Sequence, residues 1–218
     1  MIETAPDHMP YEGAGFLLRF EGNIILGLRR KKPSDFSKDP TPELEYMGGK
    51  IEHGDKNDPL LTAYNELVEE LGAIVLDTNW RERVSPLCIY QPFTQMWIWC
   101  CLIDLNATEF ARVTTAANGL ETDKWDRDQP YASWTGRATV PVRRSLEAVF
   151  LCPVESITAF ISGFKTVPAS KNRLTDAKTY RNQAKLQCTN IVTGVKAEYP
   201  LRAFNTVIWE NHMERITQ

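Results

Sequence analysis

Three glutamates at helical spacing are the residues of this chain whose types and positions best suit shared chemistry. Glu66, Glu69 and Glu70 lie in the segment PLLTAYNELVEEL, residues 59–71. Side chains three and four positions apart are neighbours on a helix, so these carboxylates repel one another, and no lysine or arginine between residues 57 and 72 relieves them. A divalent cation would, because Mg²⁺ favours a few carboxylates together with waters and substrate phosphates. The alternative is a solvated acidic face.

The segment that holds the glutamates has the signals of a helix. Asp58 is a suitable N-cap, Pro59 suits the first helical position and Gly72 is typical of the position after a helix end. Its apolar residues recur at helical spacing and form one stripe, which consists of Leu60, Tyr64, Leu67 and Leu71. The three glutamates are predicted to lie on roughly the opposite side.

Two adjacent glycines precede this helix, in the stretch LEYMGGKIEHGD at residues 44–55. Together with NELVEELGA, the stretch resembles the Nudix hydrolase signature, G-x5-E-x7-R-E-U-x-E-E-x-G-U, in which U is apolar. Gly49 matches the first glycine, and Glu66, Leu67, Glu69, Glu70 and Gly72 match the helical half. The sequence around the glycines is also similar to the MutT branch of that family. The resemblance extends over about residues 14–164.

The chain departs from the signature in the loop before the helix. Asp55 stands where the signature has its first glutamate, Asn65 stands at the arginine position, and nine residues (56–64) separate them instead of seven. In the family this glutamate and arginine commonly pair and hold the loop against the helix. We therefore expect another contact to hold it here.

The resemblance implies a role for each matched residue. Mg²⁺ or Mn²⁺ would be held by Glu66, Glu69, Glu70 and the backbone carbonyl of Gly48. The substrate would be contacted by Gly49, Lys50, Arg29 and Arg30, although these cations could instead pair with nearby acids such as Glu45. The proton from the attacking water would pass to Glu69, Glu70, Glu121 or Asp123; for the two loop acids, plain solvation is the alternative.

The rest of the sequence indicates strands interrupted by helices. We expect two strands in residues 14–31 joined at Gly22, and a short extended segment at ELEYM. Further strands are expected at 73–78, 86–91, 96–105 and 146–153, and helices at 154–164 and 200–216. The expected fold is α+β, an α/β/α sandwich of the Nudix type with a mixed sheet between helices. A Nudix domain at 1–164 would be followed by a basic C-terminal extension at 165–218.

Composition restricts the class of protein without naming a substrate. The chain has 218 residues, is 43% hydrophobic and carries a net charge of −3. No apolar run approaches the roughly 20 residues of a membrane span, and the first residues lack the pattern of a signal peptide. Five cysteines without C-x-x-C spacing favour core residues, as at Cys100 and Cys101, over a disulfide or zinc framework. We expect a cytoplasmic protein with reduced thiols and no membrane partner.

Three functions are consistent with these features. The first is a metal-dependent pyrophosphohydrolase acting on a nucleoside diphosphate linked to another group X: a nucleoside triphosphate, ADP-ribose or a dinucleoside polyphosphate. The second is removal of an RNA cap or NAD cap, with RNA held by residues 165–196, which carry seven basic side chains and one acid. The third is a non-catalytic Nudix-fold module that binds a nucleotide. Many members of the family dimerise, so a homodimer is a further implication of the resemblance.

Overall fold

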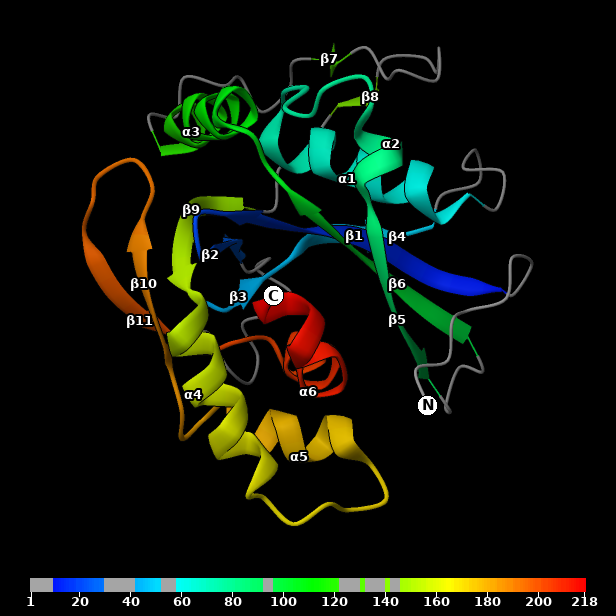
Figure 1. Cartoon of the computed structure of the whole chain (residues 1–218), viewed down its shortest axis with the longest axis vertical. Coiled ribbons are helices and arrows are strands. Elements are labelled where there is room, and N and C mark those ends of the chain that lie inside the picture. Colours follow the sequence, from blue (N-terminus) through cyan, green and yellow to red (C-terminus); the bar gives the residue numbers. More distant parts are fainter. Residues whose placement is uncertain are drawn as a thin grey trace. The chain divides into compact units, whose positions relative to one another are not determined.

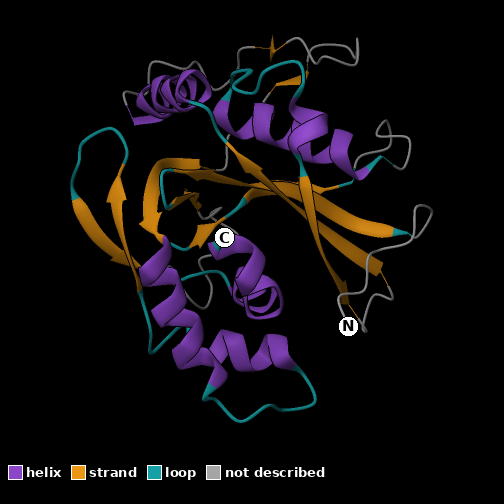
Figure 2. Ribbon diagram, in the orientation of Figure 1, coloured by secondary structure: helices purple, strands orange, loops and turns teal. Residues whose placement is uncertain are grey.

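The computed structural model of the chain describes residues 10–29, 42–51, 58–91, 96–121, 130–131, 140–141 and 146–218 (Figure 1). Six helices and eleven strands lie in these ranges, so the expected α+β class is confirmed (Figure 2). The strands are β1 (Tyr11–Phe20), β2 (Asn23–Arg29), β3 (Leu44–Glu45), β4 (Met47–Lys50), β5 (Ser85–Gln91), β6 (Met96–Asp104), β7 (Pro130–Tyr131), β8 (Val140–Pro141), β9 (Leu146–Pro153), β10 (Leu186–Asn190) and β11 (Lys196–Tyr199). The helices are α1 (Pro59–Leu71), α2 (Trp80–Arg83), α3 (Ala107–Glu121), α4 (Val154–Lys165), α5 (Arg173–Tyr180) and α6 (Ala203–Thr217). Among the described residues, no helix has both the length and the apolar character to cross a membrane.

The chain divides into two compact units. The first consists of Met1–Leu18 and Met47–Ser145, and the second of Arg19–Tyr46 and Leu146–Gln218. Residues after 164 supply α5, β10, β11 and α6 to the second unit. A domain boundary at residue 165 stays a prediction.

In the first unit, a sheet supports helix α1. Strand β6 lies between β1 and β5, and β4 pairs antiparallel with β1 so that Phe16 is opposite Met47. Helix α1 contacts β4, β6 and α3 (Figure 1). Three residues of its apolar stripe, Tyr64, Leu67 and Leu71, are buried, whereas Leu60 at the start of the helix is half-buried. The helix that holds the glutamates is thus fixed by its apolar side to the strand that holds the double glycine.

In the second unit, the strands follow the order β11-β10-β9-β2, and β3 pairs with β2. Helix α6 packs against both α4 and α5. Phe164, Ala177 and Ala203 form a buried cluster between these three helices. The segment before α6 joins β3 through a parallel bridge between Leu44 and Leu201.

Most of the expected elements are confirmed. Strands β5, β6 and β9 and helices α1, α4 and α6 form where the patterns predict them, and Gly22 adopts the positive φ of 72° expected of a turn. The strand expected at 73–78 is wrong. Val75 and Leu76 are buried there, but the backbone N–H of Asp77 donates to the Glu109 carboxylate at 2.8 Å instead of to a neighbouring strand.

Seven elements lack a counterpart among the sequence predictions. They are α2, α3, α5, β7, β8, β10 and β11. Cys100 and Cys101 are fully buried core residues, as predicted, and burial raises the pKa of both thiols far above its ordinary value.

Candidate active site

Helix α1 begins and ends where its sequence signals predict. The Asp58 side chain accepts hydrogen bonds from the backbone N–H groups of Leu60 (3.0 Å) and Leu61 (3.1 Å), which have no partner within the helix. At the other end, Gly72 adopts a left-handed conformation with φ 67° and donates its N–H to the carbonyl of Val68. The helix therefore holds Glu66, Glu69 and Glu70 in a fixed frame.

The three glutamates differ in exposure. Glu66 and Glu69 are half-buried, whereas the side chain of Glu70 is only 6% exposed. The sequence predicted all three on the side opposite the apolar stripe, and for Glu70 that is wrong. Residue 70 lies one position before Leu71 and three after Leu67, so it is at the edge of the buried stripe and is covered by the packing around it. Glutamate is seldom buried to this extent unless it is paired.

Glu66 and Gly49 are in direct contact. A Cβ atom added to Gly49 would overlap both oxygens and the carbon of the Glu66 carboxylate. Strand β4 is also close to β1, because a Cβ on Gly13 would collide with the carbonyl oxygen of Gly49. Only a residue without a side chain at position 49 leaves room for the carboxylate. The double glycine and the glutamate helix thus form one local arrangement.

This contact predicts the effect of replacing Gly49 with alanine. The new methyl group would force the Glu66 carboxylate, and with it α1, away from β4. We expect a loss of about 1–3 kcal/mol in the free energy of unfolding, the usual cost of overpacking. We also expect any hydrolytic activity to fall at least about tenfold, because misplacement by an ångström is costly in an active site.

Gly163→Ala is the matched control for Gly49→Ala. It adds a methyl group against another side-chain oxygen, the hydroxyl of Tyr180, in the second unit. Urea unfolding and turnover should be measured for both variants. Equal loss of turnover in both would contradict a specific role of the Gly49–Glu66 contact.

A salt bridge holds the start of α1. Arg81 of α2 donates through Nη2 to Oδ2 of Asp58 at 2.9 Å, so one carboxylate both caps α1 and binds α2. Trp80, next to Arg81, stacks on Tyr64 of α1 with ring centroids 5.0 Å apart and meets Phe16 edge-on at 5.5 Å. These contacts fix the C-terminal end of the loop whose usual glutamate–arginine pair is absent from the sequence. Asp55 itself lies outside the described residues.

Two substitutions at Asp58 separate its two contacts. Asp58→Ala removes both the cap and the salt bridge, and we expect a loss of about 1–2 kcal/mol in the free energy of unfolding. Asp58→Asn keeps a capping side chain but loses the charge, and the expected loss is below about 1 kcal/mol because the pair is exposed. Urea denaturation measures both. A loss in Asp58→Asn as large as that in Asp58→Ala would show that the salt bridge, and not the cap, holds this end.

The donors around Gly49 suit a hard divalent cation. Carboxylate and carbonyl oxygens are the ligands that Mg²⁺ prefers, and it usually keeps several waters besides one or two carboxylates. In the ranges that the structure describes, no group of three or more His, Cys, Asp or Glu side chains lies close enough together to hold a metal ion. Glu66, Glu69 and Glu70 are all described, so the structure does not bring these three predicted ligands together as such a group.

The other predicted site residues are placed as follows. Lys50 is exposed at the end of β4. Arg29, in the second unit, forms an ion pair with Glu45, Nε to Oε1 3.8 Å, which is the alternative noted from the sequence. Glu121 is the last residue of α3, and its side chain is not described. Arg30 and Asp123 lie outside the described residues.

A buried carboxylate network in the first unit escaped the sequence predictions. Glu109 has a fully buried side chain that accepts from Arg83 Nη1 at 3.1 Å, from Nη2 of the same residue, and from the backbone N–H of Asp77 and Asn106. Asn106 in turn accepts from the Glu109 N–H at 2.9 Å, so the two residues form a capping box for α3. The sequence signal for it is NATE, residues 106–109, with glutamate three positions after the cap.

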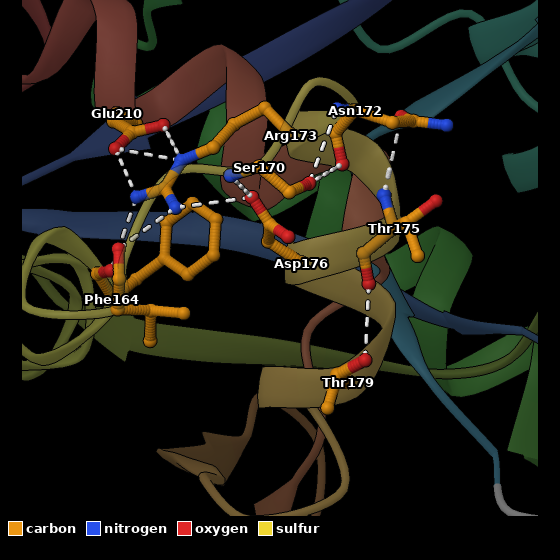
Figure 3. Close-up of polar contacts among 9 residues, drawn as sticks. Phe164, Ser170, Asn172, Arg173, Thr175, Asp176, Thr179 and Glu210 are labelled. Carbon is orange, nitrogen blue, oxygen red and sulfur yellow. Dashed lines mark hydrogen bonds and ion pairs between the residues drawn. The ribbon is translucent and has the colours of Figure 1, made fainter.

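Part of the basic C-terminal segment has an internal role. Arg173 of α5 binds Glu210 of α6 through Nε (2.9 Å) and Nη2 (2.6 Å) and donates to the carbonyl of Phe164 at the end of α4 (Figure 3). Its guanidinium also lies 3.8 Å from the Phe164 ring centroid. Hydrogen bonding to Glu210 raises the pKa of Arg173. Arg173 thus ties three helices together.

Arg181 is engaged in a similar way, because its Nη1 binds the carboxylate of Glu43. Glu210 and Glu43, which pair with Arg173 and Arg181, lie outside residues 165–196, and Arg173 also pairs with Asp176 inside the segment at 3.4 Å. These two cations therefore contribute less to an external field than the sequence count suggests. The remaining basic residues of the segment are all exposed: Lys165, Lys171, Lys178, Lys185 and Lys196. Binding of RNA by this segment stays a prediction.

Comparisons with known proteins find similarities of low sequence identity and low TM-score. No family model and no curated protein sequence matches the chain. Similar solved structures include a NUDIX hydrolase from Nitrosomonas europaea, with 12% identity, a TM-score of 0.30 and coverage of 44% of this chain and 57% of that one. A C. elegans Ap4A hydrolase has 11% identity, a TM-score of 0.37 and coverage of 68% and 84%.

A third similar structure is a bifunctional NMN adenylyltransferase/ADP ribose pyrophosphatase from Francisella tularensis, complexed with AMP and a manganese ion. It has 14% identity, a TM-score of 0.33 and coverage of 45% of this chain and 28% of that one. The chain thus spans less than two thirds of this protein and of the Nitrosomonas protein. Identities and TM-scores this low do not establish a function for this chain.

Proposed function

We propose that this protein is a Mg²⁺- or Mn²⁺-dependent pyrophosphohydrolase of the Nudix type. Its substrate would be a nucleoside diphosphate linked to a second group X, such as a nucleoside triphosphate, ADP-ribose or a dinucleoside polyphosphate. The observation that supports the proposal most directly is the contact between Gly49 and the Glu66 carboxylate. It joins the glycine half and the glutamate half of the signature in space, as a shared site requires.

The resemblance to the Nudix signature implies a role for each residue. Glu66, Glu69 and Glu70, with the carbonyl of Gly48, would hold the ion, which when bound supplies neutralisation of the diphosphate charge and activation of water. Lys50, Arg29 and Arg30 would bind phosphate oxygens, and Gly49 would let the substrate approach the backbone. Glu69, Glu70, Glu121 or Asp123 would accept the proton.

The reaction is a hydrolysis that balances without a further reactant. A bond forms between water oxygen and phosphorus, and the bridging oxygen–phosphorus bond breaks. The products are a nucleoside monophosphate and a phosphorylated X. In this proposal the three glutamates of α1 are functional, which explains why so many carboxylates occur without lysine or arginine between them.

A substrate panel tests the proposal. The protein should be incubated in the presence of Mg²⁺ with one substrate at a time: nucleoside triphosphates, ADP-ribose, dinucleoside polyphosphates and capped RNA. The products should be identified by mass spectrometry. We expect cleavage of at least one substrate, and loss of that cleavage in the presence of EDTA. If none of them is cleaved with Mg²⁺ or Mn²⁺, the enzyme proposal fails and a nucleotide-binding module becomes the better account.

A further inference from the structure

A buried carboxylate in the second unit holds two arginines that are far apart in sequence. The side chain of Glu45 is 4% exposed. Its Oε2 accepts from Nη1 of Arg202, and its Oε1 lies 3.8 Å from Nε of Arg29. The two arginine side chains are 40% and 31% exposed, so each guanidinium reaches solvent from a buried anchor.

The backbone fixes the positions of these three residues. Arg29 donates its N–H to the carbonyl of Glu43 at 3.0 Å, at the end of the β2–β3 pairing. The N–H of Arg202 donates to the carbonyl of Leu44 at 2.9 Å, and the N–H of Leu44 donates to the carbonyl of Pro200 at 3.0 Å. A segment near the C-terminus therefore brings Arg202 beside Arg29 on a rigid frame.

The charges around Glu45 do not balance. Glu43 is bound by Arg181, which leaves Glu45 as the carboxylate shared by Arg29 and Arg202. Among the residues that the structure describes, two guanidiniums, those of Arg29 and Arg202, thus share the single carboxylate of Glu45. Each guanidinium has several N–H donors in a planar fork, and only one nitrogen of Arg29 and one of Arg202 faces Glu45. The donors that remain are suited to a second anion.

The start of α6 adds to this positive character. Arg202 is the residue before the helix, and no side chain caps that helix end. Backbone N–H groups at a helix start favour negative charge. Arg202 thus belongs to a helix start, whose backbone N–H groups favour negative charge as its own guanidinium does.

We propose that Arg202 and Arg29 form a binding site for a phosphate or diphosphate group, in which Glu45 is a positioning residue. Planar guanidiniums bind phosphate oxygens in pairs, and a carboxylate behind them limits their rotation. The phosphate could belong to the substrate of the proposed hydrolysis, an assignment that rests on the proposed function, or to a separate phosphate-bearing ligand. The site itself depends on neither source.

Binding of inorganic diphosphate without metal, followed by isothermal titration calorimetry, tests the site. We expect Arg202→Gln to weaken binding by about tenfold or more, as loss of charge-assisted hydrogen bonds implies. Lys196→Gln, which removes an exposed charge of the same unit, should change the affinity by less than about twofold. Diphosphate binding by Arg202→Gln that equals that of the wild type would overturn the proposal.

A second variant controls for misfolding, because Arg202→Gln removes one of the two positive charges that compensate the buried Glu45 carboxylate. Glu45→Gln/Arg202→Gln removes both charges and should unfold at nearly the wild-type temperature while still losing diphosphate affinity. A folded double variant that binds diphosphate as the wild type does would also overturn the site.

Kinetics distinguish the two sources of the phosphate. A rise of KM in Arg202→Gln that parallels the loss of diphosphate affinity would assign the site to the substrate, whereas an unchanged KM with weaker diphosphate binding would assign it to a separate ligand. Both outcomes support the site. An absence of hydrolysis in the wild type would refute the proposed function alone, since the calorimetric result does not depend on turnover.

Discussion

Replacement of Glu70 with glutamine is expected to lower metal-dependent hydrolysis by at least about a hundredfold, the scale of losing one electrostatic contact in a preorganised site. Glutamine has nearly the same size and shape, and position 70 is 6% exposed, so an uncharged amide fits there without opening a cavity. The substitution therefore changes the charge available to a cation and leaves the packing of α1 intact. Initial rates with the best substrate of the panel, at several Mg²⁺ concentrations, measure the effect.

Glu82→Gln is the matched control for Glu70→Gln. Glu82 is exposed on α2, in the same unit, and has no assigned role. Mn²⁺ binding, followed by electron paramagnetic resonance, should weaken in Glu70→Gln and not in Glu82→Gln. Turnover by Glu70→Gln within about threefold of wild type would exclude Glu70 from the metal site and leave Glu66 and Glu69 to account for any activity.

Local signals were enough to predict the helix at the centre of the candidate site. Asp58, Pro59 and Gly72 act through hydrogen bonds and backbone conformations within a few residues, so their effects can be predicted from the local sequence. The contact between Gly49 and Glu66 was expected only from the resemblance to a family signature. The structure gives it a physical reason, which is the close approach of α1 to β4.

Other features depend on partners distant in sequence and could not be predicted from local patterns. Glu70 is buried because other parts of the chain pack over the edge of the apolar stripe. The salt bridge between Asp58 and Arg81 joins residues 23 positions apart. Arg202 reaches Glu45 across 157 positions, through a bridge between a short strand and the start of the last helix.

The error at residues 73–78 and the omission of α3 have one physical origin. Val75 and Leu76 suggested a strand, yet the backbone N–H of the next residue, Asp77, donates to Glu109 at the start of α3. The capping box in NATE was visible in the sequence and predicts a helix start there. A helix predicted to start there leads in turn to the expectation that polar residues before it bind its N-terminus, instead of forming a strand.

Replacement of Glu109 with glutamine is expected to lower the free energy of unfolding by about 3 kcal/mol, because a buried carboxylate that binds an arginine is costly to remove. Its side chain is fully buried, and the Arg83 guanidinium, 28% exposed, would keep its charge beside a neutral amide. The two oxygens of the Glu109 carboxylate accept from the backbone N–H groups of Asp77 and Asn106, one each. The amide has a single oxygen, so one of these N–H groups would lose its acceptor. Urea unfolding at neutral pH measures the loss.

Asp77→Asn is the control within the same network. Asp77 pairs with Arg112, but both side chains are 39% exposed, so the expected loss is clearly smaller than that of Glu109→Gln. If the two substitutions cost the same, burial of Glu109 would not be the cause of its larger effect.

The pH dependence of stability gives an independent test of the Glu109 charge. Burial alone would raise the pKa of Glu109, but the hydrogen bonds from Arg83 and from the two backbone N–H groups outweigh it, and the pKa is lowered from its ordinary value of 4.5. Below that value the unfolded chain binds a proton that the folded chain does not, so stability is lost as the pH falls from 4.5 through the pKa of the folded state. Glu109→Gln cannot lose this contribution, so its stability should fall less steeply than that of the wild type over this acidic range. A slope equal to that of the wild type would mean that Glu109 does not titrate there, and that the cost of its replacement comes from packing and hydrogen bonding instead of charge.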